Sequence, residues 1–210
     1  MPTEAVANGV GTVLLGWQSL VVHASPLPAW GPAYPGTLPV RGRHMQTDSW
    51  LGQPTTARVT GDFFYYVDSP ADPAVEKMEN EPVFERKVML SWVALIKDSG
   101  CIEAHLFRGS CAKAPDLRMQ HLQAAVMAGH DLWDPVAKAE GKDMTWWGFA
   151  ATRPYMRAIK ALGLEHHARG DLRAARDCFE ALLDMNPNDN QGVRQALDVM
   201  DAESATAPRM

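Results

Sequence analysis

Residues 154–187, PYMRAIKALGLEHHARGDLRAARDCFEALLDMNP, constrain the fold of this chain more than any other segment. Two runs of helical periodicity are separated by Gly170 and Asp171 and closed by Pro187. Glycine suits the left-handed end of a first helix, aspartate can cap the start of a second, and proline cannot continue one. The segment is therefore predicted to form two helices joined by a tight turn.

The spacing of small and large residues in this segment resembles the tetratricopeptide repeat. That repeat is about 34 residues long and follows the pattern W-x2-L-G-x2-Y, with Ala, Phe and Pro at fixed later offsets. Five positions of this chain match the pattern: Leu162, Gly163, Ala175, Phe179 and Pro187. Two positions depart from it, because Ile159 stands for Trp and His166 for Tyr.

Each matching residue has a physical role in such a repeat. Gly163 and Ala175 would let the two helices approach closely, while Leu162 and Phe179 would fill the space around their crossing. Beyond the repeat, the sequence predicts a capping helix over residues 189–200. Residues 150–200 as a whole are similar to the closing unit of a group of tetratricopeptide-like proteins without an assigned function. The resemblance implies stacked helical hairpins that bind another protein.

Helical signals also precede the repeat, and about three such units are usually needed to bury their faces. Asn80 can cap a helix whose first turn holds Pro82 and which would stop at Gly100. Its apolar residues recur at helical spacing in one stripe: Phe84, Val88, Trp92, Leu95 and Ile96. We therefore expect this helix to belong to the stack.

A second upstream helix is predicted between Asp116 and Gly129, with the aspartate as its cap and the glycine at its end. We expect the segment from Leu122 to Pro135 to be the second helix of a degenerate unit, paired with the helix over residues 80–99. Residues 101–114 are ambiguous, since Gly109 would break a short helix there.

The first third of the chain is predicted to be an irregular arm rich in Pro and Gly, residues 1–72, followed by a helical domain over residues 73–205. Its apolar run Gly9–Val22 is too short to span a bilayer and lacks the basic residues that precede a signal sequence. Aromatic and β-branched residues predict a short β element near residues 56–67, either a hairpin or one strand against the helices.

Composition narrows the classes of function. A hydrophobic share of 46% and a charged share of 21% are typical of soluble globular proteins. A net charge of -5 gives no basic face for nucleic acid, and no segment predicts a membrane span. Three cysteines without close spacing indicate reduced thiols and a cytoplasmic location.

The sequence predicts no catalytic residue, no metal and no cofactor. His166 and His167 are adjacent, so on a helix they point about 100° apart and cannot share one ion. His166 is instead expected to be a packed, hydrogen-bonded residue, and Cys178 a core residue rather than a reactive thiol. No nucleophile elbow or dinucleotide fingerprint occurs in the chain.

A concentration of basic residues on the repeat favours binding to a partner protein. Its members are Arg153, Arg157, Lys160, Arg169, Arg173 and Arg176. We expect Arg157, Lys160 and Arg173 to contact an acidic segment of the partner; the alternative is a solvated face balanced by nearby acids.

The predicted function is that of a scaffold or adaptor, and activity as an enzyme is the less favoured expectation. Two alternatives stay open: an enzyme or enzyme subunit with a pocket lined by Trp146, Trp147 and His130, and a structural subunit of a larger assembly.

Overall fold

The computed structural model describes residues 57–60, 65–141 and 144–206, all within one unit of the chain, residues 40–210. These residues are mainly helical, as the sequence predicts. The helices are α1 (Asp72–Asn80), α2 (Phe84–Lys97), α3 (Ile102–Cys111), α4 (Pro115–Glu140), α5 (Arg153–Ala168), α6 (Leu172–Met185) and α7 (Val193–Thr206). Two short 3₁₀ turns, η2 (Trp146–Gly148) and η3 (Ala150–Thr152), precede α5. The predicted apolar run Gly9–Val22 and most of the predicted arm lie outside the described residues.

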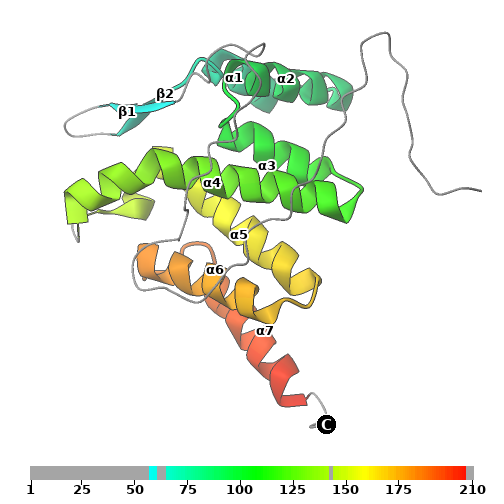
Figure 1. The fold of residues 1–210 in the computed structure, drawn as a ribbon, viewed down its shortest axis with the longest axis vertical. Coiled ribbons are helices and arrows are strands. Elements are labelled where there is room, and N and C mark those ends of the chain that lie inside the picture. Colours follow the sequence, from blue (N-terminus) through cyan, green and yellow to red (C-terminus); the bar gives the residue numbers. More distant parts are fainter. Residues whose placement is uncertain (1–56, 61–64, 142–143, 207–210) are drawn as a thin grey trace, which may run out of the picture. The chain divides into compact units, whose positions relative to one another are not determined.

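The helices pack as three successive hairpins, α1 with α2, α3 with α4 and α5 with α6 (Figure 1). Each hairpin contacts the next through α2 and α3 or through α4 and α5, and α7 packs against α6. Because α3 also contacts α5, the first helices of neighbouring hairpins lie along one side of the stack.

The α5–α6 hairpin has the close crossing that its glycine predicts. A Cβ atom on Gly163 would lie 2.7 Å from Cε1 of Phe179 and 3.0 Å from Cβ of Cys178, so only glycine fits. Ala175 and Phe179 are fully buried at this crossing. In the turn, Gly170 has a φ of 79°, and the Asp171 carboxylate accepts a hydrogen bond from the Ala174 amide at 3.2 Å.

The prediction that this helix ends at Gly129 is wrong, because α4 continues through Gly129 and Pro135 to Glu140. Gly129 instead provides space for α5: a Cβ atom there would lie 2.1 Å from Cδ2 of Tyr155. The added turns bury Trp133 completely. Tertiary packing therefore outweighs the helix-breaking tendency of these two residues.

The structure differs from two further expectations, the break at Gly109 and the pairing of the helices over residues 80–99 and 122–135. Helix α3 runs through Gly109 rather than breaking there, and a Cβ atom on Gly109 would lie 3.1 Å from Cδ2 of Leu122 on α4. Helix α4 accordingly pairs with α3, and α2 pairs with α1. The ambiguous stretch is thus the missing helix of the middle hairpin.

Helix α2 begins at Phe84 after the cap residue Val83, whereas Asn80 and Pro82 belong to the end of α1 and the following turn. The predicted apolar stripe does not all face the core, because Trp92 is 50% exposed and Ile96 is 69% exposed. The side that faces the stack instead carries the small buried residues Ser91 and Ala94, which allow α1 and α3 to approach closely.

The predicted β element is an antiparallel hairpin of β1 (Arg58–Thr60) and β2 (Tyr66–Asp68), with Val59 opposite Val67. It is tied to the helices through Tyr65, whose ring lies 6.1 Å from that of Trp133 and 4.6 Å from that of Phe149.

The capping helix α7 starts later and runs further than predicted, from Val193 to Thr206. Asp189 explains the start, because its carboxylate accepts hydrogen bonds from the amides of Val193 at 2.7 Å and Arg194 at 3.0 Å. The three residues between Asp189 and Val193 are therefore not helical.

Candidate functional site

A groove of about 550 Å³ opens between α1, α3, α4 and α5. Its position follows from the hairpin order, since the first helices of all three hairpins contribute to its walls. The apolar lining residues are Met78, Leu106, Phe107, Leu122, Ala161 and Leu164. Leu164 is 46% exposed, so part of this apolar surface is open to a ligand.

Charged side chains border this apolar surface. Glu79 of α1 and Glu103 of α3 supply carboxylates, and Arg157 of α5 supplies a guanidinium group. Burial raises the pKa of Glu103, and the charge of Glu79 acts in the same direction, while Arg157 opposes the shift. The groove can therefore bind a ligand in which apolar side chains stand next to a cationic one, with the cation facing Glu79 and Glu103.

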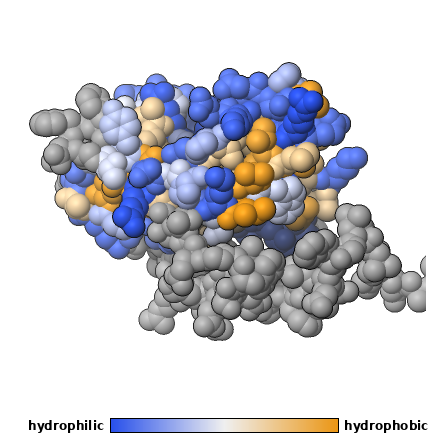
Figure 2. Space-filling model, turned by 90° about the horizontal axis from the view of Figure 1, so that it is seen from above, coloured by the Kyte–Doolittle hydropathy of each residue, from blue (hydrophilic) through white to orange (hydrophobic). Residues whose placement is uncertain are grey.

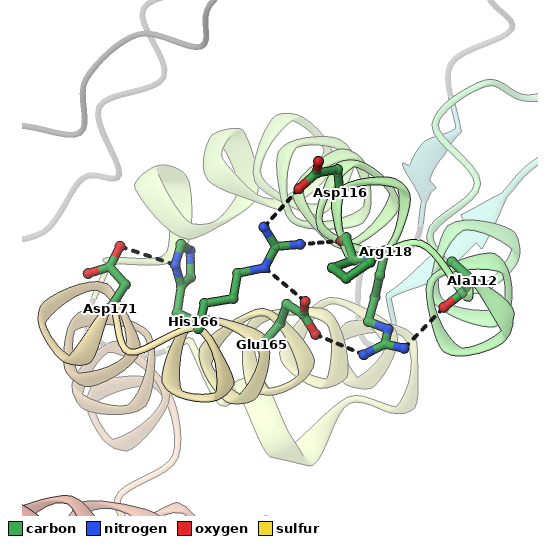
Figure 3. Close-up of polar contacts among 8 residues, drawn as sticks. Ala112, Asp116, Arg118, Glu165, His166 and Asp171 are labelled. Carbon is green, nitrogen blue, oxygen red and sulfur yellow. Dashed lines mark hydrogen bonds and ion pairs between the residues drawn. The ribbon is translucent and has the colours of Figure 1, made fainter. Parts of the chain in front are cut away.

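The buried residue Glu165 lines one part of the groove, and its carboxylate accepts hydrogen bonds from two arginines (Figure 3). Arg118 of α4 donates to it at 3.3 Å and Arg169 donates at 2.9 Å. Arg118 also donates to the Ala112 carbonyl, and Arg169 to the Asp116 carboxylate, both at 3.1 Å. These bonds join the last turn of α5 to the first turn of α4 and so fix the second hairpin to the third.

The three predicted contact residues are not brought together. Arg157 is exposed and lines the groove. Lys160 points toward the turn before α7, where its ammonium group donates to the Gln191 carbonyl. Arg173 is exposed at the start of α6, and neither it nor Lys160 lines the groove.

Two members of the predicted basic concentration are paired with acids, and two others donate to backbone carbonyls. Arg169 pairs with Glu165 and Asp116, and Arg176 pairs with Asp201. Arg153 lies over the ring of Trp147 at 4.9 Å. This arrangement favours the solvated, balanced face over a basic docking patch.

The residues of the alternative pocket do not line the groove either. His130 lies on α4 with its ring nitrogens 3.8 Å from Asp131 and 3.9 Å from Asp134. Trp146 packs beside Tyr155, at a centroid distance of 6.1 Å, and so closes the space before α5.

A smaller opening of about 380 Å³ lies between the β hairpin, the start of α3 and the start of α5. The thiol among its lining side chains, that of Cys101, is buried, and burial raises its pKa to about 12. The thiol is therefore protonated at neutral pH and is a poor nucleophile.

The two adjacent histidines point to different partners, as their helical positions predict. Nδ1 of His166 lies 3.4 Å from the Asp171 carboxylate, and Nε2 of His167 lies 2.8 Å from the Glu203 carboxylate on α7. Cys178 was predicted to be a core residue; it is half-buried, and burial raises the pKa of its thiol to about 12. Across the described part of the chain, no three metal-ligating side chains come together.

A second pair of histidines was not predicted from the sequence: His105 of α3 and His121 of α4, whose Nδ1 atoms lie 3.1 Å apart. They are 16 residues apart in the chain, and only the α3–α4 hairpin brings them together. Burial lowers the pKa of both rings, that of His121 to about 4, and the nearby Arg108 lowers both further.

Comparison with known proteins gives no match: no family model, no curated protein and no solved structure matches this chain. The geometry of the described residues is therefore the basis for the function proposed below. None of the helices in the described ranges is long and apolar enough to cross a membrane.

Proposed function

We propose that this chain is a tetratricopeptide-like protein that binds a segment of another protein in the groove between α1, α3, α4 and α5. The observation that supports the proposal most is the composition of this groove, in which apolar side chains are bordered by charges from three successive hairpins. Helical repeats commonly present such surfaces on one side of the stack.

The chemistry of the lining favours a partner segment with apolar and basic side chains. Leu106, Phe107 and Leu164 offer apolar contacts along the groove. Glu79 and Glu103 outnumber Arg157, and the other arginine of the groove, Arg118, already pairs with Glu165. A lysine or arginine next to an apolar residue would place its charge against these two carboxylates.

The predicted cytoplasmic location belongs to the same proposal. All three cysteines are free, and two of them have thiols whose pKa is raised to about 12. Free thiols are typical of a reducing compartment.

The proposal is tested by panning a phage-displayed library of random peptides against the full-length chain. We expect enriched peptides to combine apolar and basic residues. Leu164→Glu should weaken their binding at least about tenfold, because it places a charge on the apolar wall of the groove. Glu103→Gln should weaken the basic peptides more than their neutral analogues.

Arg173→Glu provides the matched control, since Arg173 is exposed and lies outside the groove. Its binding should equal that of the unchanged chain. Absence of enriched peptides, or equal binding by the Leu164→Glu and Arg173→Glu variants, would contradict the proposal.

A further inference from the structure

Helix α2 carries an exposed apolar stripe, which borders α3 at Trp92. Met89, Trp92, Val93 and Ile96 follow the i, i+3, i+4, i+7 spacing of one helical face. Their exposed fractions are 67%, 50%, 40% and 69%. We call these four residues the α2 outer face; Figure 2 looks down on the α1–α2 end and shows hydrophobic side chains gathered there.

The composition of α2 indicates that this face is normally covered. The nine residues from Val88 to Ile96 contain no charged side chain, and their one polar residue, Ser91, is buried, so the outer side of the helix is apolar over more than two turns. Such helices are typical of protein interiors, whereas surface helices carry polar residues on their outer side. On the side that faces the stack, α2 buries the small residues Ser91 and Ala94 and packs the partly buried Leu95, whereas the four residues of the α2 outer face stay exposed.

One member of the α2 outer face is already held in place. The guanidinium group of Arg108 lies 3.7 Å from the ring centroid of Trp92, and this group also donates to the Ser91 hydroxyl at 3.5 Å. A fixed aromatic side chain loses little conformational freedom on binding, which is the property of an interface anchor.

The other end of the stack is different, because α7 closes it with a polar surface. Its exposed residues include Arg194, Gln195, Asp198, Asp201 and Glu203. Terminal helices of repeat proteins carry such polar outer faces to keep the stack soluble. The two ends therefore do not complement each other, and association of the α2 end with the α7 end of another copy is disfavoured.

We propose that the α2 outer face binds the same face of a second copy of this chain, giving a symmetric dimer. An interface between two identical faces closes after two copies and leaves no apolar face exposed. With four exposed side chains, one of them aromatic, each copy offers roughly 500 Å² of apolar surface, since an aromatic side chain alone can bury 150–250 Å². Two copies would together bury roughly 1,000 Å², about the least that a biological interface buries and below the roughly 1,200–2,000 Å² of stable complexes, so the dimer should be weak and depend on concentration.

The proposal is tested by the mass of the full-length chain in solution, measured by sedimentation velocity across the micromolar range. We expect the mass to rise from that of one chain to that of two as the concentration increases. Met89→Glu combined with Ile96→Glu should raise the dissociation constant at least about tenfold, because each change places a charge in the interface. Both residues are largely exposed, so far-UV circular dichroism should stay unchanged.

Val199→Glu is the matched control, because Val199 is 46% exposed on α7 at the opposite end. It should leave the dimer intact. A mass of one chain at every concentration would overturn the proposal. A dimer that persists in the double variant would overturn it equally.

Cross-linking gives a second test that does not depend on a charged substitution. In a Cys111→Ser background, Met89→Cys should form a disulfide between two copies under mild oxidation, whereas Val199→Cys should not. Equal cross-linking at both positions would contradict the symmetric α2 interface.

Discussion

The ring of Tyr155 on α5 lies directly against the backbone of Gly129 on α4, where a Cβ atom would be 2.1 Å from its Cδ2 atom. Tyr155 is 4% exposed, so surrounding side chains prevent its ring from moving away. This contact sets how closely the second hairpin approaches the third, and the groove lies between the same helices.

Gly129→Ala should therefore destabilise the protein although alanine is the better helix former. The gain in helix propensity is about 1 kcal/mol, while forcing a methyl group into a packed site costs about 1–3 kcal/mol and here displaces an aromatic ring. We expect a net loss in the free energy of unfolding, measured by urea denaturation. Gly109→Ala should cost less, because it meets the flexible end of Leu122; the reverse order would contradict this account.

Glu165→Gln should weaken the junction between α4 and α5. The carboxylate accepts charge-assisted hydrogen bonds from Arg118 and Arg169, and such bonds contribute about 1.5–3 kcal/mol. Both arginines keep some exposure to water, so we expect a loss toward the lower end of that range. Urea denaturation measures it, with Asp116→Asn as a control because Asp116 is 90% exposed. Equal losses for the two variants would refute a special role of Glu165.

Acid should destabilise the fold through the pair His105 and His121. Burial lowers the pKa of His121 from 6.5 to about 4, with further contributions from the charges of His105 and Arg108. Between these two values the unfolded chain binds more protons than the folded chain, so the free energy of unfolding falls as the pH decreases. Urea denaturation at several pH values between 7 and 4 should show this slope.

His121→Asn removes one titrating ring from this pair and should make the slope shallower. His105 is the remaining partner, and its pKa is also lowered by burial, while the Ser99 carbonyl and Asp98 oppose the shift. An unchanged slope in the variant would show that other groups cause the acid sensitivity.

Thiol labelling should distinguish the three cysteines. Burial raises the pKa of Cys101 and Cys178 to about 12, so both are protonated at neutral pH and react slowly. Cys111 and Cys178 are both half-buried, but Cys111 lies at the end of α3 beside the exposed Ser110, whereas Cys178 packs against Gly163 of α5, so Cys111 should be alkylated first. Mass spectrometry of the iodoacetamide-treated native chain gives the order, and labelling in urea should make the three rates similar. Fast native labelling of Cys178 would contradict its place between α5 and α6.

Features that depend on a few neighbouring residues could be predicted from the sequence. The turn at Gly170 and Asp171, the close crossing at Gly163 and the β hairpin around Val59 all rest on local conformational preferences or on periodicity. Helix ends could not be predicted as well, because Gly129 and Pro135 disfavour a helix locally while the burial of Trp133 favours it.

Only part of the candidate site could be predicted from the sequence. Arg157 was predicted to contact a partner, and it lines the groove; Lys160 shares its helix but turns toward Gln191. Glu79 and Glu103 carry no sequence signal that distinguishes them from other surface acids. They become neighbours only because α1 and α3 lie on the same side of the stack.

The sequence by itself determined that this chain forms helices, where its last hairpin turns and which small residues let the helices cross, since these depend on contacts within a short segment. Tertiary structure alone decided which charges are paired and which apolar face of α2 points outward. Arg169 and Asp116 are 53 residues apart and Arg176 and Asp201 are 25 apart. The packing of whole helices, and not local preference, brings such groups together.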